Sequence, residues 1–138
     1  MRWGMAAAFL MLAISATDMA LSAHHSFAAE YDRNKPVTLM GSVTKVEWMN
    51  PHVYFYIDVK EPAGTAATWA IEGGAPNTLY RAGWRKDSLK IGDVVTVHGY
   101  LARDGTKLAN MSTVILADGR EVLGGQGPGA PPPKPPGR

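Results

Sequence analysis

Cysteine is absent from the 138 residues of the chain, and several kinds of chemistry are excluded with it. Disulfides, thiolate catalysis, zinc–thiolate sites and a lipid anchor on an N-terminal cysteine all need a residue that this chain does not have. Neither sign of charge is in large excess, because 14 Lys and Arg stand against 12 Asp and Glu for a net charge of +2. Without a Lys/Arg block, the composition argues against a nucleic-acid partner.

Recognisable catalytic patterns are missing as well. The chain has no Gly-x-Ser-x-Gly elbow, no glycine-rich phosphate loop and no His-Glu-x-x-His helix. Glu47, Asp58 and Glu72 fall in expected strands, but nothing in their spacing pairs them as an acid and a base. The sequence therefore predicts a protein that is not an enzyme.

A leader segment is present at the N-terminus. Arg2 precedes an apolar run over residues 6–14, and Ala23 has the small side chain expected before a signal-peptidase cut. The apolar run is shorter than the about 20 residues of a membrane span. We expect residues 1–23 to be a cleavable signal peptide, with no membrane span after cleavage and the periplasm as destination. A cut after Ala20 and an uncleaved anchor are the alternatives.

Period-two alternation dominates the middle of the chain. It begins at Val37, slips in phase near Lys45 as at a β-bulge, and is clean over residues 53–59. Further strands are expected over residues 68–72, 94–101, 107–116 and 120–123, with a short helix from Pro76 to Gly83. This divides the chain into an N-terminal arm (24–36), a β domain (37–123) and a disordered Gly/Pro-rich tail (124–138).

The order of these elements predicts the fold class. Three strands, one short helix and then two or three strands are the order of an OB-like Greek-key barrel, an all-β fold of five to six strands. A bulged first strand that contains Gly41 suits the strong curvature of so small a barrel. A plain antiparallel sandwich without a helix is the alternative.

The four histidines are the candidate metal ligands: His24, His25, His52 and His98. Cleavage after Ala23 would place an α-amine and an imidazole on His24, and these two nitrogens can chelate one metal ion. A further imidazole from His52 or His98 would complete a nitrogen-only site, which resembles the histidine brace of certain copper proteins. The alternative is a flexible arm with His52 capping a turn and His98 on the surface.

Aromatic side chains offer a different binding surface. Trp48, Tyr54 and Tyr56 could form an exposed stacking face of the kind that OB-folds use, or could simply pack the core and its rim. On this interpretation the protein is a metal-free module that binds a peptide, a glycan or a partner protein.

Four sequence blocks carry a family resemblance: HHSFAAEYD from His24, VEWMNPHV from Val46, WAIEGG from Trp69 and GWRKDSLK from Gly83. Together they resemble a family of small, uncharacterised exported proteins of Gram-negative bacteria, classed as a domain of unknown function. The resemblance covers nearly all of residues 24–123 and implies a periplasmic location with a mature start near His24. It implies no activity, cofactor or catalytic residue. The resulting hypothesis is a small periplasmic binding protein for copper or another divalent metal.

Overall fold

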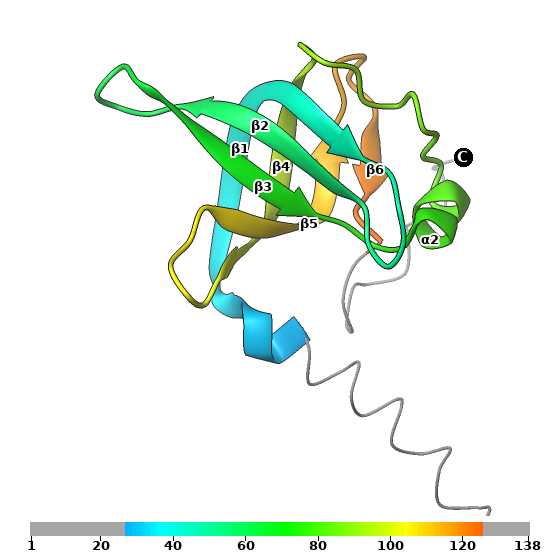
Figure 1. Cartoon of the computed structure of the whole chain (residues 1–138), viewed down its shortest axis with the longest axis horizontal. Coiled ribbons are helices and arrows are strands. Elements are labelled where there is room, and N and C mark those ends of the chain that lie inside the picture. The colour runs from blue at the N-terminus through cyan, green and yellow to red at the C-terminus, as the bar shows by residue number, and fades with distance from the viewer. Residues whose placement is uncertain (1–26, 126–138) are drawn as a thin grey trace, which may run out of the picture.

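The computed structural model describes residues 27–125, and it consists of six strands and two short helical segments (Figure 1). The signal peptide, His24, His25 and nearly all of the Gly/Pro-rich tail lie outside these residues and stay predictions. Residues 27–30 form a helical turn. The elements that follow are β1 (Tyr31–Glu47), β2 (Tyr54–Lys60), β3 (Ala66–Glu72), α2 (Pro76–Arg81), β4 (Val94–Ala102), β5 (Leu108–Ile115) and β6 (Glu121–Leu123).

Five of the strands close into a ring. The sheet runs in the order β3-β2-β1-β4-β5-β6, and a parallel pairing of β3 with β5 joins the two sides. All other pairings are antiparallel. With α2 between β3 and β4, this is the predicted OB-like barrel, and the fold class is confirmed.

Strand β1 is shared by both halves of the barrel, since its first part pairs with β4 and its last part with β2. The register shifts between Val43 and Lys45, which confirms the bulge expected near Lys45. Gly41 lies where β1 turns from one partner to the other, and a Cβ there would meet the Asp58 carbonyl oxygen at 2.4 Å. The strand can therefore curve this sharply only with glycine at this position.

The start of β1 differs from the expectation. The alternation suggested Val37, but the strand begins six residues earlier at Tyr31, so residues 31–36 belong to the barrel and not to an arm. Tyr31 pairs with Ala102, and Arg103 holds the preceding helical turn by donating to the carbonyls of Glu30 (2.8 Å) and Ala28 (2.6 Å). Residues 31–36 show little alternation of buried and exposed side chains, and these contacts with the end of β4 hold them in the strand.

The core lies inside the ring. Alternate residues of β2, among them Phe55 and Ile57, are fully buried together with Trp84 and Leu79. The indole of Trp84 donates to the Leu123 carbonyl at 2.7 Å, which ties the segment after α2 to β6. In α2, Leu79 is buried but Tyr80 is 58% exposed, so this six-residue helix contributes one side chain to the core. No helix among residues 27–125 has the length and apolar character to cross a membrane.

Candidate functional site

A buried carboxylate, Glu72, lies at the C-terminal end of β3. Its neighbour Ile71 points into the core, so alternation sends Glu72 to the outer side of the barrel, yet only 8% of the residue is exposed. Residue Glu72 pairs with Tyr54 on one side and with Asn110 of β5 on the other. A buried ionisable group at a strand end needs hydrogen-bond partners, since an unpaired one costs much free energy.

Two side chains from distant segments supply those partners. The Tyr31 hydroxyl at the start of β1 donates to Oε2 of Glu72, and Nδ1 of His52 in the β1–β2 loop hydrogen-bonds Oε1. Each carboxylate oxygen therefore has its own partner. The Tyr31 ring is buried, whereas the His52 side chain is 48% exposed, so the cluster is closed on the tyrosine side and open to solvent at the imidazole.

Two further groups lie close to this carboxylate. Burial raises the pKa of the Tyr54 hydroxyl most. The charge of Glu72 and a hydrogen bond with Glu72 raise this pKa further, so Tyr54 stays a neutral phenol. Burial and the hydrogen bond to Glu72 raise the pKa of Tyr31 in the same way. Desolvation and the neighbouring Glu72 raise the pKa of Glu30, while His52 acts in the opposite direction. The site is thus rich in negative charge and has His52 as its nearest basic group.

The arrangement fixes which nitrogen of His52 can act. A carboxylate only accepts hydrogen bonds, so the contact with Glu72 matches the tautomer with the proton on Nδ1, in which Nε2 carries the lone pair that can bind a metal. Among residues 27–125, Nε2 of His52 has no hydrogen-bond partner. An imidazole held by a carboxylate through one nitrogen, with the other exposed, is the usual arrangement around a metal-binding histidine.

The described residues do not contain a complete metal site. No group of three or more His, Asp or Glu side chains within residues 27–125 comes close enough to hold a metal ion. Any site at His52 therefore needs ligands from outside this range, and His24 and His25 are the nearest histidines in sequence. Phe27, two residues after His25, packs on the Tyr31 ring with 5.4 Å between centroids.

His98, the fourth predicted ligand, has different surroundings. It lies on β4, where its Nδ1 is 2.9 Å from the Thr38 hydroxyl of β1. The structure therefore gives His52 and His98 separate hydrogen-bond partners and does not place them in one cluster. Whether either one binds a metal stays a prediction.

The three predicted aromatic residues are likewise distributed over separate surroundings. Tyr54 lies beside Glu72, whereas the Tyr56 hydroxyl donates to Glu47 at 3.2 Å and Lys45 lies over its ring. Trp48 packs partly against the core and lines a groove beside α2. This groove, here called the α2 groove, has a volume of about 480 Å³. Its lining comprises Trp48, Met49, Asn50, Pro76, Asn77, Tyr80, Arg85 and Lys86.

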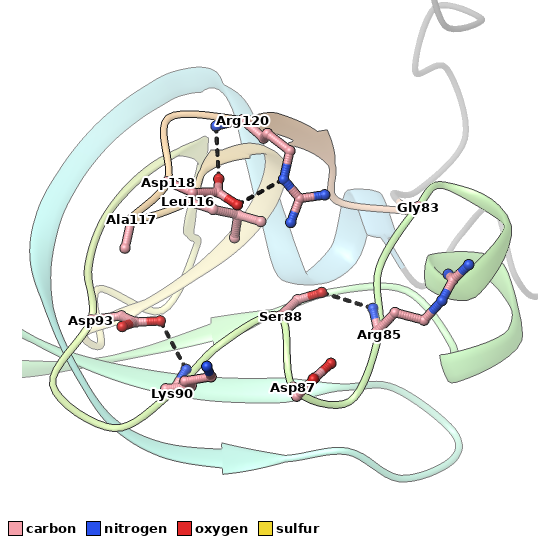
Figure 2. Close-up of a pocket in the computed structure, with 10 residues that line it drawn as sticks. All are labelled: Gly83, Arg85, Asp87, Ser88, Lys90, Asp93, Leu116, Ala117, Asp118 and Arg120. Atoms are coloured by element: carbon pink, nitrogen blue, oxygen red, sulfur yellow. Dashed lines mark hydrogen bonds and ion pairs between the residues drawn. The ribbon is translucent and has the colours of Figure 1, made fainter.

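A second depression of about 370 Å³ lies between the segment after α2 and the β5–β6 turn (Figure 2). It is lined by charged side chains, and Figure 2 shows three of them, Asp93, Asp118 and Arg120, engaged with one another or with the backbone. Asp118 accepts from Arg120 at 2.8 Å, and Asp93 accepts from the Lys90 backbone at 3.0 Å. Such internal pairing stabilises the two turns.

Sequence reasoning missed Glu72 and Tyr31 as members of the site. They are separated by 41 residues, and each looked like one polar or aromatic residue in an ordinary strand. One signal was available in the sequence. The carboxylate of Glu72 comes directly after the apolar Trp69–Ile71 stretch and directly before the glycines that end β3. Charged residues at such strand ends are frequently functional.

Comparisons with known proteins identify a family and leave the activity open. A family model described as "Family of unknown function (DUF6152)" matches residues 10–111. No curated protein matches the chain. Among solved structures, TiaS in complex with a transfer RNA and ATP is similar at 24% identity and a TM-score of 0.45, over 62% of this chain and only 18% of that one. The N-terminal domain of PriB from Thermoanaerobacter tencongensis is similar at 21% identity and a TM-score of 0.39, over 61% and 97%.

Proposed function

Because the chain belongs to DUF6152, a family of unknown function, we propose its activity from the site: it is a small periplasmic protein that binds a divalent metal ion, copper above others. The ligands are the α-amine and imidazole of His24 after signal cleavage, joined by Nε2 of His52. The observation that carries the proposal is the hydrogen bond between His52 Nδ1 and Glu72, which holds the ring and leaves Nε2 free.

The tether between the mature N-terminus and His52 is short. Phe27 packs on Tyr31, and Tyr31 donates to the same carboxylate that holds His52. An extended chain covers about 3.3–3.6 Å per residue, so His25 lies within about 7 Å of Phe27 and His24 within about 11 Å. This short tether to an anchored helical turn supports a metal site that His24 would share with His52.

Charge and ligand type favour a soft or borderline divalent cation. The raised pKa of Glu30 reflects desolvation and repulsion from Glu72, and a bound cation would relieve that repulsion. Three nitrogen ligands favour copper(II), which heads the affinity order of the divalent first-row metals. Calcium and magnesium prefer oxygen ligands.

The α-amine gives the decisive test. Acetylation near pH 6.5 modifies an α-amine, with its pKa of about 7.7–8.0, in preference to lysine with a pKa of about 10.4. We expect copper(II) to bind the processed protein at least about 10-fold more tightly than its Nα-acetylated form, and His52→Ala to lose a similar factor. His98→Ala is the matched control and should keep the parent affinity. Equal affinity of the free and acetylated forms would exclude the proposal.

The premise of cleavage has its own measurement. The intact mass of the protein isolated from the periplasm gives the mature N-terminus, and the same sample analysed under native conditions reports a retained metal. A start at His24 supports the proposed ligand set. A mature chain that still carries residues before His24, or protein found only in the cytoplasm, contradicts it.

A second candidate function is a metal-free module that binds a peptide, a glycan or a partner protein through aromatic side chains. The α2 groove favours it, because it combines Trp48 with two exposed side chains, Met49 (57%) and Tyr80 (58%). On this alternative, Tyr80→Ala weakens binding of the ligand while Nα-acetylation has no effect on it. The two hypotheses therefore respond to different changes.

A further inference from the structure

The α2 groove has an aromatic wall that is held in place before anything binds. Arg85 lies over the Tyr80 ring, with its guanidinium carbon 4.0 Å from the ring centroid. The same guanidinium donates to the carbonyls of Tyr80 (3.2 Å) and Trp84 (2.6 Å), so it is fixed to the backbone that follows α2. Binding on this wall therefore requires little ordering of side chains.

The described chain ends beside α2, on the side of the helix that carries Thr78 and Leu79. Gly125 lies so close to α2 that a Cβ on it would be 2.7 Å from Leu79 Cδ2 and 3.3 Å from Thr78 Cγ2. The backbone just before it is anchored, since Gly74 donates to the Gly124 carbonyl at 2.9 Å. The chain thus leaves the barrel at the helix that contributes Pro76, Asn77 and Tyr80 to the groove.

The residues that follow have the composition that such grooves bind. Six of residues 126–138 are proline: Pro128, Pro131, Pro132, Pro133, Pro135 and Pro136. Proline-rich segments favour the polyproline II conformation, and they bind to grooves lined by aromatic rings because little conformational entropy is lost. Trp48 and Tyr80 are aromatic residues in the groove lining.

From these three observations we infer that residues 126–138 bind in the α2 groove of their own chain, with the proline run against Trp48, Met49 and Tyr80. The proposal concerns a different surface from the metal site and does not depend on it. Pro131 comes six positions after Gly125, a reach of about 20 Å. Helix α2, with six residues, is about 9 Å long and about 10–12 Å across with its side chains, so this reach is enough for the run to pass round the helix and lie along the groove.

Proximity makes even a weak contact effective. A short tether gives an effective concentration in the millimolar range, so a contact with a millimolar dissociation constant is formed about half of the time. Lys134 and Arg138 have the same charge as Arg85 and Lys86 in the groove. The attraction is therefore apolar, and added salt should strengthen the contact by screening this repulsion.

The absence of cysteine makes a direct test simple. Gly137→Cys introduces a single site for a nitroxide label in the full chain, and the label broadens the NMR signals of nearby nuclei. We expect the strongest broadening at the Trp48 indole N–H and at the Met49 amide, increasing with salt. Tyr80→Ala should abolish this enhancement, because Tyr80 is exposed and its loss leaves the core intact.

Two controls separate the possible outcomes. Ile91→Ala removes another exposed apolar side chain, outside the groove, and should leave the broadening unchanged. Replacing Pro131, Pro132 and Pro133 by serine should abolish it. Broadening that is the same in all variants overturns the proposal. So does broadening that appears when labelled chains are mixed with unlabelled, isotope-enriched chains, because the groove would then bind the tail of a second copy.

Discussion

Tyr31 and Glu72 are joined by a buried hydrogen bond between the first residue of β1 and the last residue of β3. It ties the start of β1 to the end of β3 and supplies a donor to Oε2 of the buried Glu72 carboxylate. The other oxygen is bonded by His52, which is the exposed member of the cluster. The same carboxylate therefore links the stability of the barrel to the orientation of the proposed metal ligand.

Tyr31→Phe tests the contribution of this hydrogen bond to stability. The variant keeps the buried ring but leaves one oxygen of a buried carboxylate without its donor, which costs about 1–3 kcal/mol. We expect the free energy of unfolding in urea to fall by that amount. Tyr100→Phe, at an aromatic residue that also touches Phe27, is the control and should change stability by less than about 0.5 kcal/mol. An equal loss in both variants would show that the hydroxyl of Tyr31 contributes nothing specific.

The raised pKa of Glu30 predicts a pH dependence in the metal-free protein. A carboxyl whose pKa is higher in the folded than in the unfolded state stabilises the fold below its ordinary pKa of 4.5. That contribution is lost as the pH rises through the raised value. Glu30→Gln removes the titration, so its unfolding free energy relative to the parent should increase from pH 4 towards pH 7.

Glu61 provides the opposite case as a control. Lys107, 2.7 Å away, lowers the pKa of Glu61, so this group stabilises the fold above its ordinary pKa and loses that effect as the pH falls. Glu61→Gln should therefore lose stability relative to the parent as the pH rises. Urea titrations at several pH values, with a chelator present, measure both slopes. Slopes of the same sign in the two variants would contradict the electrostatic account.

Gly99 tests the β4 bulge next to the buried Asn110. The register shifts between His98 and Gly99, and a Cβ on Gly99 would lie 1.6 Å from the Asn110 carbonyl oxygen. Backbone cannot move aside as a flexible side chain can, so Gly99→Ala should destabilise by more than about 3 kcal/mol or prevent folding. His98→Ala, the neighbouring change on the outer side, should cost less than about 1 kcal/mol. Similar thermal unfolding of both variants would show that the bulge tolerates a side chain.

The barrel could be predicted from the sequence because its signals are local. Alternation at Val53, Phe55 and Ile57 marks a strand with one buried side, and Asp104-Gly105 marks a hairpin. The early start of β1 gave no such signal. Residues 32–36 are polar and exposed or half-buried, and they extend the strand only because the end of β4 and Arg103 lie beside them.

The site was harder to predict than the barrel. His52 was recognisable as a candidate because histidine is rare and the turn at Asn50-Pro51 is readable. Its partner was not, since Glu72 meets His52 and Tyr31 only after β1, β2 and β3 have paired in register. Alternation places Glu72 on the solvent side, and only the surrounding side chains make it buried. Clusters built from single residues of three segments have no spacing rule in the sequence.

Glu72→Gln tests both roles of the carboxylate, its hydrogen bond with Tyr31 and its contact with His52. The amide oxygen of glutamine can still accept from His52, but the amide nitrogen cannot accept from Tyr31, and the negative charge that makes the imidazole a stronger ligand is gone. Outer-shell changes of this kind typically cost about 10–100-fold in metal affinity. We expect copper(II) binding to the processed protein to weaken by such a factor in isothermal titration.

Glu47→Gln is the matched control for this prediction. It alters a strand carboxylate that pairs instead with Lys45, and its copper affinity should equal that of the parent. A urea titration of the metal-free variant establishes that it is folded under the conditions used. Unchanged copper affinity in folded Glu72→Gln would remove His52 from the ligand set, while a loss in Glu47→Gln as well would mean that net charge and not the Glu72–His52 contact governs binding.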